Sequence, residues 1–376
     1  MTDKGTVKII GAGPGSLVAA IVLRRHGFAV KVFEMSPDVG HRLSGDFQGV
    51  ENWSSEKDVT EILGEIGVGI NFLWMPYYEG TVYAPEMKPV QVKSGRPIFY
   101  LVRRGSMPGT LDWGLKEQAL SLGVEIIFNH RLDNLEGKAI VGTGPKGADA
   151  VAVGITFNTK MQDKAVVVLD DNIAPKGYAY LLVKQGYATM ATVLYREFKK
   201  ADDYFEKMLG FFEDKMDLGI KNRKKFGGFG NFFIRDKQTR NEKLYIGEAA
   251  GFQDCLWGFG MRYSMLSGYI AAKSYIEGSD YDVLWQRELR PMLETSLVNR
   301  YLFERIGHAG YRYLIKCFGR GDPARVLRKH YNPSFLKNLL LPLAKKGYES
   351  RVKDLSCSRK DCTCVWCRCG TKKVCP

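Results

Sequence analysis

The sequence lacks the long apolar run that would cross a membrane. No stretch of its 376 residues approaches the roughly 18 consecutive apolar residues of a spanning helix. No basic-then-apolar segment precedes the first apolar run, Val7 to Ile10, so a secretory signal is not expected either. Composition is ordinary for a folded chain, with 45% hydrophobic and 26% charged residues. We therefore expect a globular, cytoplasmic protein.

Cysteine is scarce along most of the chain and crowded at its end. Only Cys255 and Cys317 precede the last 20 residues. A disulfide framework would be spread through a small secreted domain, whereas a dense terminal cluster in a cytoplasmic chain favours a metal site. Thiolates bind both zinc and iron–sulfur clusters. We predict one of these metals, with a flexible thiol-rich tail as the alternative; the predicted ligands are Cys357, Cys362, Cys364, Cys367, Cys369 and Cys375.

Histidine and acidic residues are also in short supply. The five histidines form neither a metal-ligand spacing nor a nucleophile–base pair. Lysine and arginine number 55 against 41 acidic residues, which gives a formal net charge of +14. Such a surface favours acidic partners. We expect an acidic electron carrier or an anionic membrane surface rather than nucleic acid.

A dinucleotide fingerprint lies in the first strand–helix–strand unit, in which a helix from Leu17 to His26 separates two short apolar strands. A glycine-rich turn between strand and helix brings a pyrophosphate to the helix N-terminus. Glu34 ends the second strand, where a carboxylate accepts ribose hydroxyls. Arg42, in the next loop, is a candidate for pairing with the adenosine or pyrophosphate. The turn residues predicted to bind the cofactor are Gly11, Gly13, Pro14, Gly15 and Ser16, the last in place of a third glycine.

A second glycine-rich signature runs from Gly247 to Met261 and reads GEAAGFQDCLWGFGM. It resembles the GDAAGxxxPxxGxG motif of the p-hydroxybenzoate hydroxylase superfamily, and within it most closely the geranylgeranyl reductase family. Three further segments resemble that family: Val141 to Gly144, Tyr100 to Arg104 followed by Leu111-Asp112, and Gly177 to Leu181. Together the similar segments cover residues 1 to about 300.

This resemblance implies FAD as the cofactor. The glycine turn and the helix after it would face the flavin, where negative charge collects on reduction. The further cofactor-binding residues implied are Arg104, Gly144, Gly247, Glu248, Gly258, Gly260 and Met261. Tyr178 and Tyr180 would face the substrate cavity. Cys255 stands where the family has proline, and is either a reactive thiol or a packing residue. His41, in the loop near the flavin, is the histidine to test as a proton donor.

The predicted fold is α/β, with a Rossmann-type FAD-binding domain of the glutathione-reductase-like kind interleaved with an antiparallel sheet that binds substrate. A helical C-terminal region and the cysteine-rich tail would follow. A helix is expected over residues 55–66, with Ser54 or Ser55 as its N-cap. The predicted divisions are 1–70, 100–160 and 240–300 for the FAD domain, 71–99 and 161–239 for the substrate domain, 301–350 for the helical region and 351–376 for the tail.

The function implied is reduction of carbon–carbon double bonds in an apolar isoprenoid or lipid-like substrate. A flavin-dependent monooxygenase, and a flavoprotein that acts through its basic metal-binding tail, are the alternatives. Because the sequence has one nucleotide fingerprint, the flavin would be reduced by briefly docked NAD(P)H or by a ferredoxin or flavodoxin. The apolar segment Phe335 to Leu343, followed by Lys345-Lys346, would either pack on the core or rest on a membrane surface.

Overall fold

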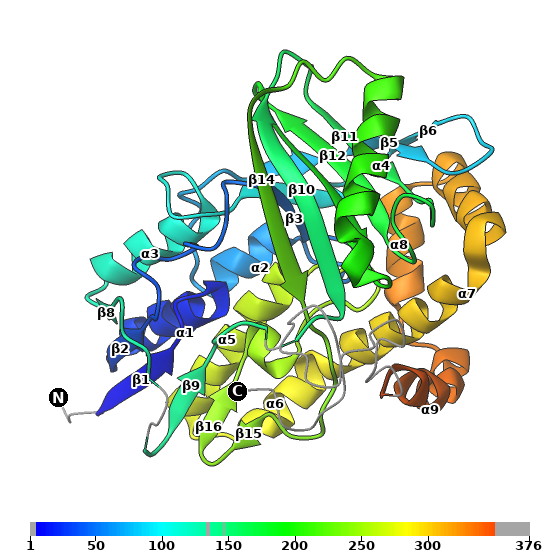
Figure 1. Cartoon of the computed structure of the whole chain (residues 1–376). Helices are drawn as coiled ribbons and strands as arrows, with labels where there is room; N and C mark the ends of the chain where they lie inside the picture. The colour runs from blue at the N-terminus through cyan, green and yellow to red at the C-terminus, as the bar shows by residue number, and fades with distance from the viewer. Residues whose placement is uncertain (1–4, 133–135, 146, 350–376) are drawn as a thin grey trace.

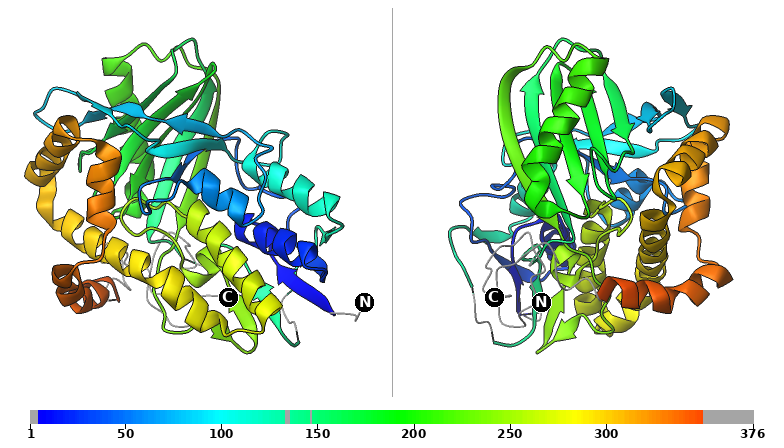
Figure 2. Two further views of the ribbon diagram at one scale, coloured as in Figure 1. Left: turned by 180° about the vertical axis from the view of Figure 1, so that it is seen from behind. Right: turned by 45° about the vertical axis from the view of Figure 1, so that its right-hand side comes forward.

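The chain folds around two large sheets with helices on their outer faces. The computed structural model describes residues 5–132, 136–145 and 147–349. In Figure 1 the sheet that contains the N-terminal strand lies below, the larger sheet stands above it, and the C-terminal helices run along one side. The other two views show the same arrangement of the three parts (Figure 2).

The first sheet has parallel strands at its centre and an antiparallel strand at one edge. Its apolar side chains belong to the largest hydrophobic cluster of the molecule, which confirms the Rossmann-type unit predicted from the sequence. In spatial order the strands are β15 (Thr239–Arg240), β16 (Lys243–Tyr245), β9 (Ala139–Val141), β1 (Thr6–Ile10), β2 (Ala29–Phe33) and β8 (Glu125–Ile127).

Helix α1 (Pro14–Arg25) is buried from Gly15 to Leu23 and packs against α3 (Leu111–Ser121) and α5 (Met261–Glu277). Proline at its first position fits a helix start because the missing N–H would have no helical partner there. Gly27, with a φ of +82°, follows its last turn and lets the chain reverse into β2. The three helices cover the first sheet and bury its apolar residues.

The second sheet is antiparallel except where β11 pairs with β5. Helix α4 (Ala201–Lys215) packs on strands β10 and β13 through its apolar face. Residues 150–158, which the sequence division placed in the first domain, pair within this second sheet. Its strands, in spatial order, are β14 (Lys221–Gly230), β10 (Ala150–Asn158), β13 (Tyr187–Leu194), β12 (Tyr178–Lys184), β11 (Lys164–Val168), β5 (Glu79–Tyr83) and β6 (Val90–Lys93).

A small antiparallel sheet joins the two large ones; its strands are β3 (Phe47–Glu51), β7 (Phe99–Arg103) and β4 (Met75–Tyr77). The helix after β3, α2 (Val59–Glu65), begins four residues later than the sequence pattern suggested. Asp58 caps it by accepting from the Thr60 N–H at 2.8 Å. The predicted Ser54 or Ser55 cap is therefore wrong, because both hydroxyls are engaged by other side chains.

The C-terminal region is helical, as predicted, and bends around the side of the larger sheet (Figure 1). Gly307, at φ +53° and ψ −163°, interrupts the long helix α7 and produces its kink. None of the helices among the described residues is both long and apolar enough to cross a membrane. The helices are α6 (Tyr281–Glu288), α7 (Arg290–Arg320), α8 (Pro323–Tyr331) and α9 (Phe335–Glu349).

Candidate functional site

The predicted cofactor segments meet at the carboxyl edge of the parallel sheet. The first glycine turn follows β1, Glu34 follows β2, Gly144 follows β9 and Gly247 follows β16. Backbone hydrogen bonds continue past the strand ends, from Gly142 N–H to Ile10 O at 2.8 Å and from Ile246 N–H to Val141 O at 3.0 Å. In open α/β sheets ligands bind outside this edge. The four segments therefore lie where a dinucleotide site is expected.

The first glycine turn has no room for a side chain at Gly11. Gly11 has a φ of +87°, and a Cβ on it would lie 2.5 Å from the carbonyl oxygen of Gly142. Gly13 caps α1 with no side-chain hydrogen bond. The Glu34 carboxylate lies beside this turn, because it accepts from the Ala12 N–H at 2.8 Å. The turn thus presents a bare backbone next to a carboxylate.

The last two turn residues face other parts of the protein. A Cβ on Gly15 would lie 2.4 Å from the carbonyl oxygen of Ser264 in α5, and the Gly15 N–H donates to the Ser264 hydroxyl at 3.1 Å. The Ser16 hydroxyl is buried and would lie 2.3 Å from a Cβ on Gly142. Ser16 thus packs between helix and strand, as a small residue at the third fingerprint position should, whereas the contact of Gly15 with α5 could not be read from the fingerprint.

Charged side chains lie around Glu248 in the second signature. Glu248 lies 3.5 Å from Arg42, which brings two of the predicted cofactor residues together. Burial raises the pKa of Glu248, and the charges of Arg42 and Arg104 oppose this rise. Arg104 makes a two-pronged ion pair with Asp112 at 2.8 Å for each bond. Gly144, at φ +79°, would place a Cβ 3.9 Å from Arg42.

The rest of the second signature leads into α5. Gly247, at φ +55°, donates its N–H to the Ser267 hydroxyl at 2.9 Å. Gly258 also needs a left-handed backbone, with φ +78°. Gly260 caps α5 without a side-chain bond, and Met261 is its buried first residue. A second uncapped helix start thus lies in the segment that the resemblance assigns to the flavin.

The loop between these glycines is anchored by distant elements. The Cys255 N–H donates to the Ser296 hydroxyl at 3.1 Å, and the buried Arg300 donates to the Leu256 carbonyl at 3.0 Å; both partners belong to α7. The Tyr178 hydroxyl, from β12, donates to the Trp257 carbonyl at 2.7 Å. The larger sheet and the C-terminal helices therefore hold this loop in place.

The predicted catalytic residues divide between the interior and the surface. Tyr178 and Tyr180 lie 6.1 Å apart between ring centroids, and both belong with Cys255 to one apolar cluster. Burial raises the pKa of the Cys255 thiol far above its ordinary range, so the thiol is neutral and suits packing. His41 is exposed in a turn.

Residues 351–376, with all six cysteines of the predicted metal site, lie outside the described residues.

Asp254 is a buried carboxyl group inside the second signature that the motif comparison did not single out. It is 1% exposed, and accepts from the Trp257 N–H at 2.7 Å and the Tyr331 hydroxyl at 2.8 Å. Burial raises its pKa to about 6, with a smaller contribution from the charge of Glu51. Its burial depends on Tyr331 from α8, so no local sequence signal could have found it.

We predict that Asp254→Asn removes a pH dependence of stability. The folded-state pKa of about 6 exceeds the ordinary 3.8, so the stabilising proton is fully bound below about pH 4 and lost as the pH rises through 6. The difference in unfolding free energy between variant and wild type should shift by about 2.5 kcal/mol in the variant's favour between pH 4 and 7.5. Urea unfolding across this range measures it.

Asp236→Asn is the matched control, because the Asp236 side chain is 92% exposed. Its unfolding free energy should track that of the wild type at every pH. Equal pH dependence in the wild type and Asp254→Asn would show that Asp254 does not hold a proton in the folded state.

The residues present fit FAD. Gly13 starts α1 without a side chain, so its helix N-terminus is bare for a pyrophosphate, and Glu34 supplies acceptors at the adjacent strand end. Near the second signature, Gly260 starts α5 without a side-chain cap. These groups would hold the two ends of a dinucleotide.

Comparisons with known proteins agree with this site. Residues 9–50 match the family model of an NAD(P)-binding Rossmann-like domain, a range that includes the glycine turn and Glu34. The chain is 32% identical to a thiamine thiazole synthase of Pyrococcus horikoshii over 26% of its own length; it covers 39% of that relative. This similarity is therefore limited to part of each protein.

Two similarities extend over most of the chain. A digeranylgeranylglycerophospholipid reductase of Methanocaldococcus jannaschii is 23% identical, over 84% of this chain and 88% of that protein. A solved structure from Thermoplasma acidophilum, described as geranylgeranyl bacteriochlorophyll reductase-like, has a TM-score of 0.68 at 16% identity and covers 92% of this chain and 99% of that one. The resemblance predicted from the motifs is thereby confirmed: the chain is similar to a digeranylgeranylglycerophospholipid reductase over most of its length and has the fold of the geranylgeranyl reductase-like structure.

Proposed function

We propose that this protein is an FAD-dependent reductase of carbon–carbon double bonds in an apolar isoprenoid or lipid-like substrate. The observation that carries the proposal is the similarity to a digeranylgeranylglycerophospholipid reductase over 84% of the chain, together with the meeting of both glycine signatures at one sheet edge. The apolar surroundings of Tyr178 and Tyr180 also suit a hydrocarbon chain.

Each part of the site has a distinct task in this proposal. The turn at Gly11 and Gly13 and the carboxylate of Glu34 hold the adenosine and pyrophosphate end of FAD. The second signature holds the flavin end, and reduced flavin, when bound, supplies the hydride. Burial raises the pKa of both phenols still further above physiological pH, so Tyr178 and Tyr180 stay neutral. They form an aromatic wall that excludes water and orients the double bond.

The electron donor and the terminal metal are finer parts of the proposal. The net charge of +14 favours an acidic ferredoxin or flavodoxin as donor, with NAD(P)H as the alternative. The six cysteines after residue 356 would bind zinc or an iron–sulfur cluster. The cluster would pass electrons toward the flavin, whereas zinc would be structural. A cytoplasmic location at the membrane face would suit a lipid-like substrate.

The test is anaerobic turnover of a geranylgeranyl glycerolipid by chemically reduced protein, followed by mass spectrometry. Each double bond should gain two hydrogens, one as hydride and one as a proton, while the flavin is reoxidised. A product that has instead gained an oxygen atom, formed only in air, would favour the monooxygenase. Recovery of unchanged lipid from flavin-loaded protein, with every donor supplied, would contradict the proposed substrate class.

Two glycine variants separate cofactor loss from general strain. Gly11→Ala should lose flavin and turnover, since the added Cβ meets the Gly142 carbonyl at 2.5 Å. Gly27→Ala is the matched control: it has nearly the same φ, +82° against +87°, but its Cβ would meet no atom within 4 Å. It should retain both flavin and turnover, at a cost of about 1 kcal/mol in stability.

A further inference from the structure

Helix α9 exposes an apolar stripe that covers no part of the described fold. Phe335 is 80% exposed, Leu336 69%, Leu339 66% and Leu343 54%. At 3.6 residues per turn these four residues share one side of the helix. Large apolar side chains grouped in this way, and not scattered, indicate a binding surface.

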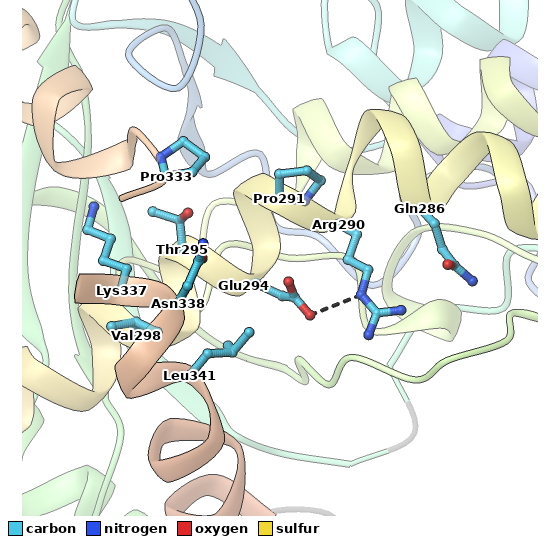
Figure 3. Close-up of a pocket in the computed structure, with 10 residues that line it drawn as sticks. All are labelled: Gln286, Arg290, Pro291, Glu294, Thr295, Val298, Pro333, Lys337, Asn338 and Leu341. Carbon is cyan, nitrogen blue, oxygen red and sulfur yellow. Dashed lines mark hydrogen bonds and ion pairs between the residues drawn. The ribbon is translucent and has the colours of Figure 1, made fainter. Parts of the chain in front are cut away.

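The opposite side of α9 is packed on the protein. Leu340, Leu341 and Ala344 belong to an apolar cluster with residues of α7. Figure 3 shows Asn338 and Leu341 turned toward α7, beside a cavity of about 280 Å³. The helix therefore has two apolar sides, and its orientation is determined by the inner one. Because the inner side already packs on α7, turning the helix to bury the outer stripe would expose that inner side.

The region around this stripe is strongly basic. Helix α8 leads into α9 through three residues, and between Pro323 and Lys346 there are six lysine and arginine residues and no acidic residue. Two of the six, Arg328 and Lys345, also pair with acidic side chains outside these helices. Lys346 is exposed on the same side of α9 as the apolar stripe. An apolar stripe bordered by cations is the pattern of helices that lie in a membrane interface.

We propose that α9 rests on an anionic lipid bilayer, with its apolar stripe in the headgroup–acyl boundary and the surrounding cations on lipid phosphates. A second copy of this chain is disfavoured, because pairing through α9 would bring two basic surfaces together. An acidic electron carrier would match the charge but not the four exposed apolar side chains. A bilayer surface matches both.

The inner side of α9 connects this surface to the candidate site. The apolar cluster that contains Ala344 also contains Cys255 and is contacted by Tyr178 and Tyr180. A lipid chain that leaves the bilayer at α9 is thus close to the aromatic wall assigned to the substrate. This connection rests on the proposed function, whereas docking of α9 does not require turnover.

The test is binding of the full-length, flavin-loaded protein to vesicles, measured by flotation. We expect binding to mixed phosphatidylglycerol and phosphatidylcholine vesicles, and weaker binding to phosphatidylcholine alone. Leu339→Asp should weaken binding at least about tenfold, because it removes an apolar side chain that would enter the bilayer and adds a negative charge. Lys346→Gln should weaken binding about fivefold on the anionic vesicles and leave it unchanged on the neutral ones.

Leu120→Asp is the matched control, since Leu120 is a 43% exposed leucine on α3, at the other end of the molecule from α9 (Figure 2). It should bind like wild type, and all variants should retain flavin and the wild-type melting temperature. Absence of vesicle binding, or equal losses in Leu120→Asp and Leu339→Asp, would overturn the proposal. The proposal would also be overturned if the wild type did not bind vesicles but self-associated, and Leu339→Asp abolished that self-association. Vesicle binding without reductase activity would contradict the proposed function alone.

Discussion

Gly268→Ala is expected to destabilise the protein by about 3 kcal/mol or more and to release the flavin. A Cβ on Gly268 would lie 1.9 Å from the carbonyl oxygen of Gly15 and 2.7 Å from its carbonyl carbon. Both atoms are backbone, so no side-chain rotation can relieve the overlap. Helices α1 and α5 would have to separate, and with them the two glycine signatures.

The matched control is Gly210→Ala, the same change in the interior of α4. A Cβ on Gly210 would meet nothing within 4 Å. Alanine has the higher helix propensity, so this variant should gain up to about 1 kcal/mol. Thermal unfolding and the flavin-to-protein absorbance ratio measure both effects. If Gly268→Ala melts with the wild type and keeps its flavin, α1 and α5 do not approach as closely as the structure shows.

The contact between Gly15 and Gly268 also shows what sequence reasoning could reach. The strand, glycine turn and helix at the N-terminus were predicted because each signal is local: apolar strand residues, a glycine-rich turn and an apolar helical segment. Only the start of the helix differs, at Pro14 in place of Leu17. The partner of Gly15 lies in a distant segment, and nothing near either glycine in the chain indicates the other. Glycine in the fingerprint was therefore assigned to the cofactor alone.

The other source of error was segments whose sequence fits two different structures. Ser54 and Ser55 are good helix caps by type, yet their hydroxyls bond to side chains that come from β3 and α5, and Asp58 caps α2. The segment that became α9 was predicted either to pack on the core or to face a membrane. The structure shows an inner face that packs and an outer apolar face that does not, a distinction that depends on tertiary contacts.

Arg262→Met should destabilise the protein by about 3–5 kcal/mol, the usual result of removing one partner of a buried ion pair. Arg262 is 4% exposed and Glu51 1%, and their charged groups lie 3.2 Å apart. Arg262 also donates to the hydroxyls of Ser54 and Ser55, at 2.9 and 2.7 Å. Without the guanidinium, the Glu51 carboxylate would remain buried beside the start of α5 with no opposing charge.

The position of Arg262 adds a reason why the pair must stay together. It is the second residue of α5, where the helix dipole disfavours a cation, so Glu51 is needed to offset it. The double variant Arg262→Met/Glu51→Gln should therefore recover most of the stability that Arg262→Met loses. A double-mutant cycle by urea unfolding at neutral pH gives the coupling free energy directly.

Lys273→Met is the matched control on the same helix. Lys273 lies 3.8 Å from Glu277, and the two side chains are 35% and 48% exposed. Breaking this pair should change the unfolding free energy by no more than about 0.5 kcal/mol, because water solvates both charges. If Arg262→Met and Lys273→Met lost similarly small amounts of unfolding free energy, water would have to reach Glu51. In that case the junction between the small sheet and α5 would be open, and the flavin end of the site would lack the rigid support inferred from its buried contacts.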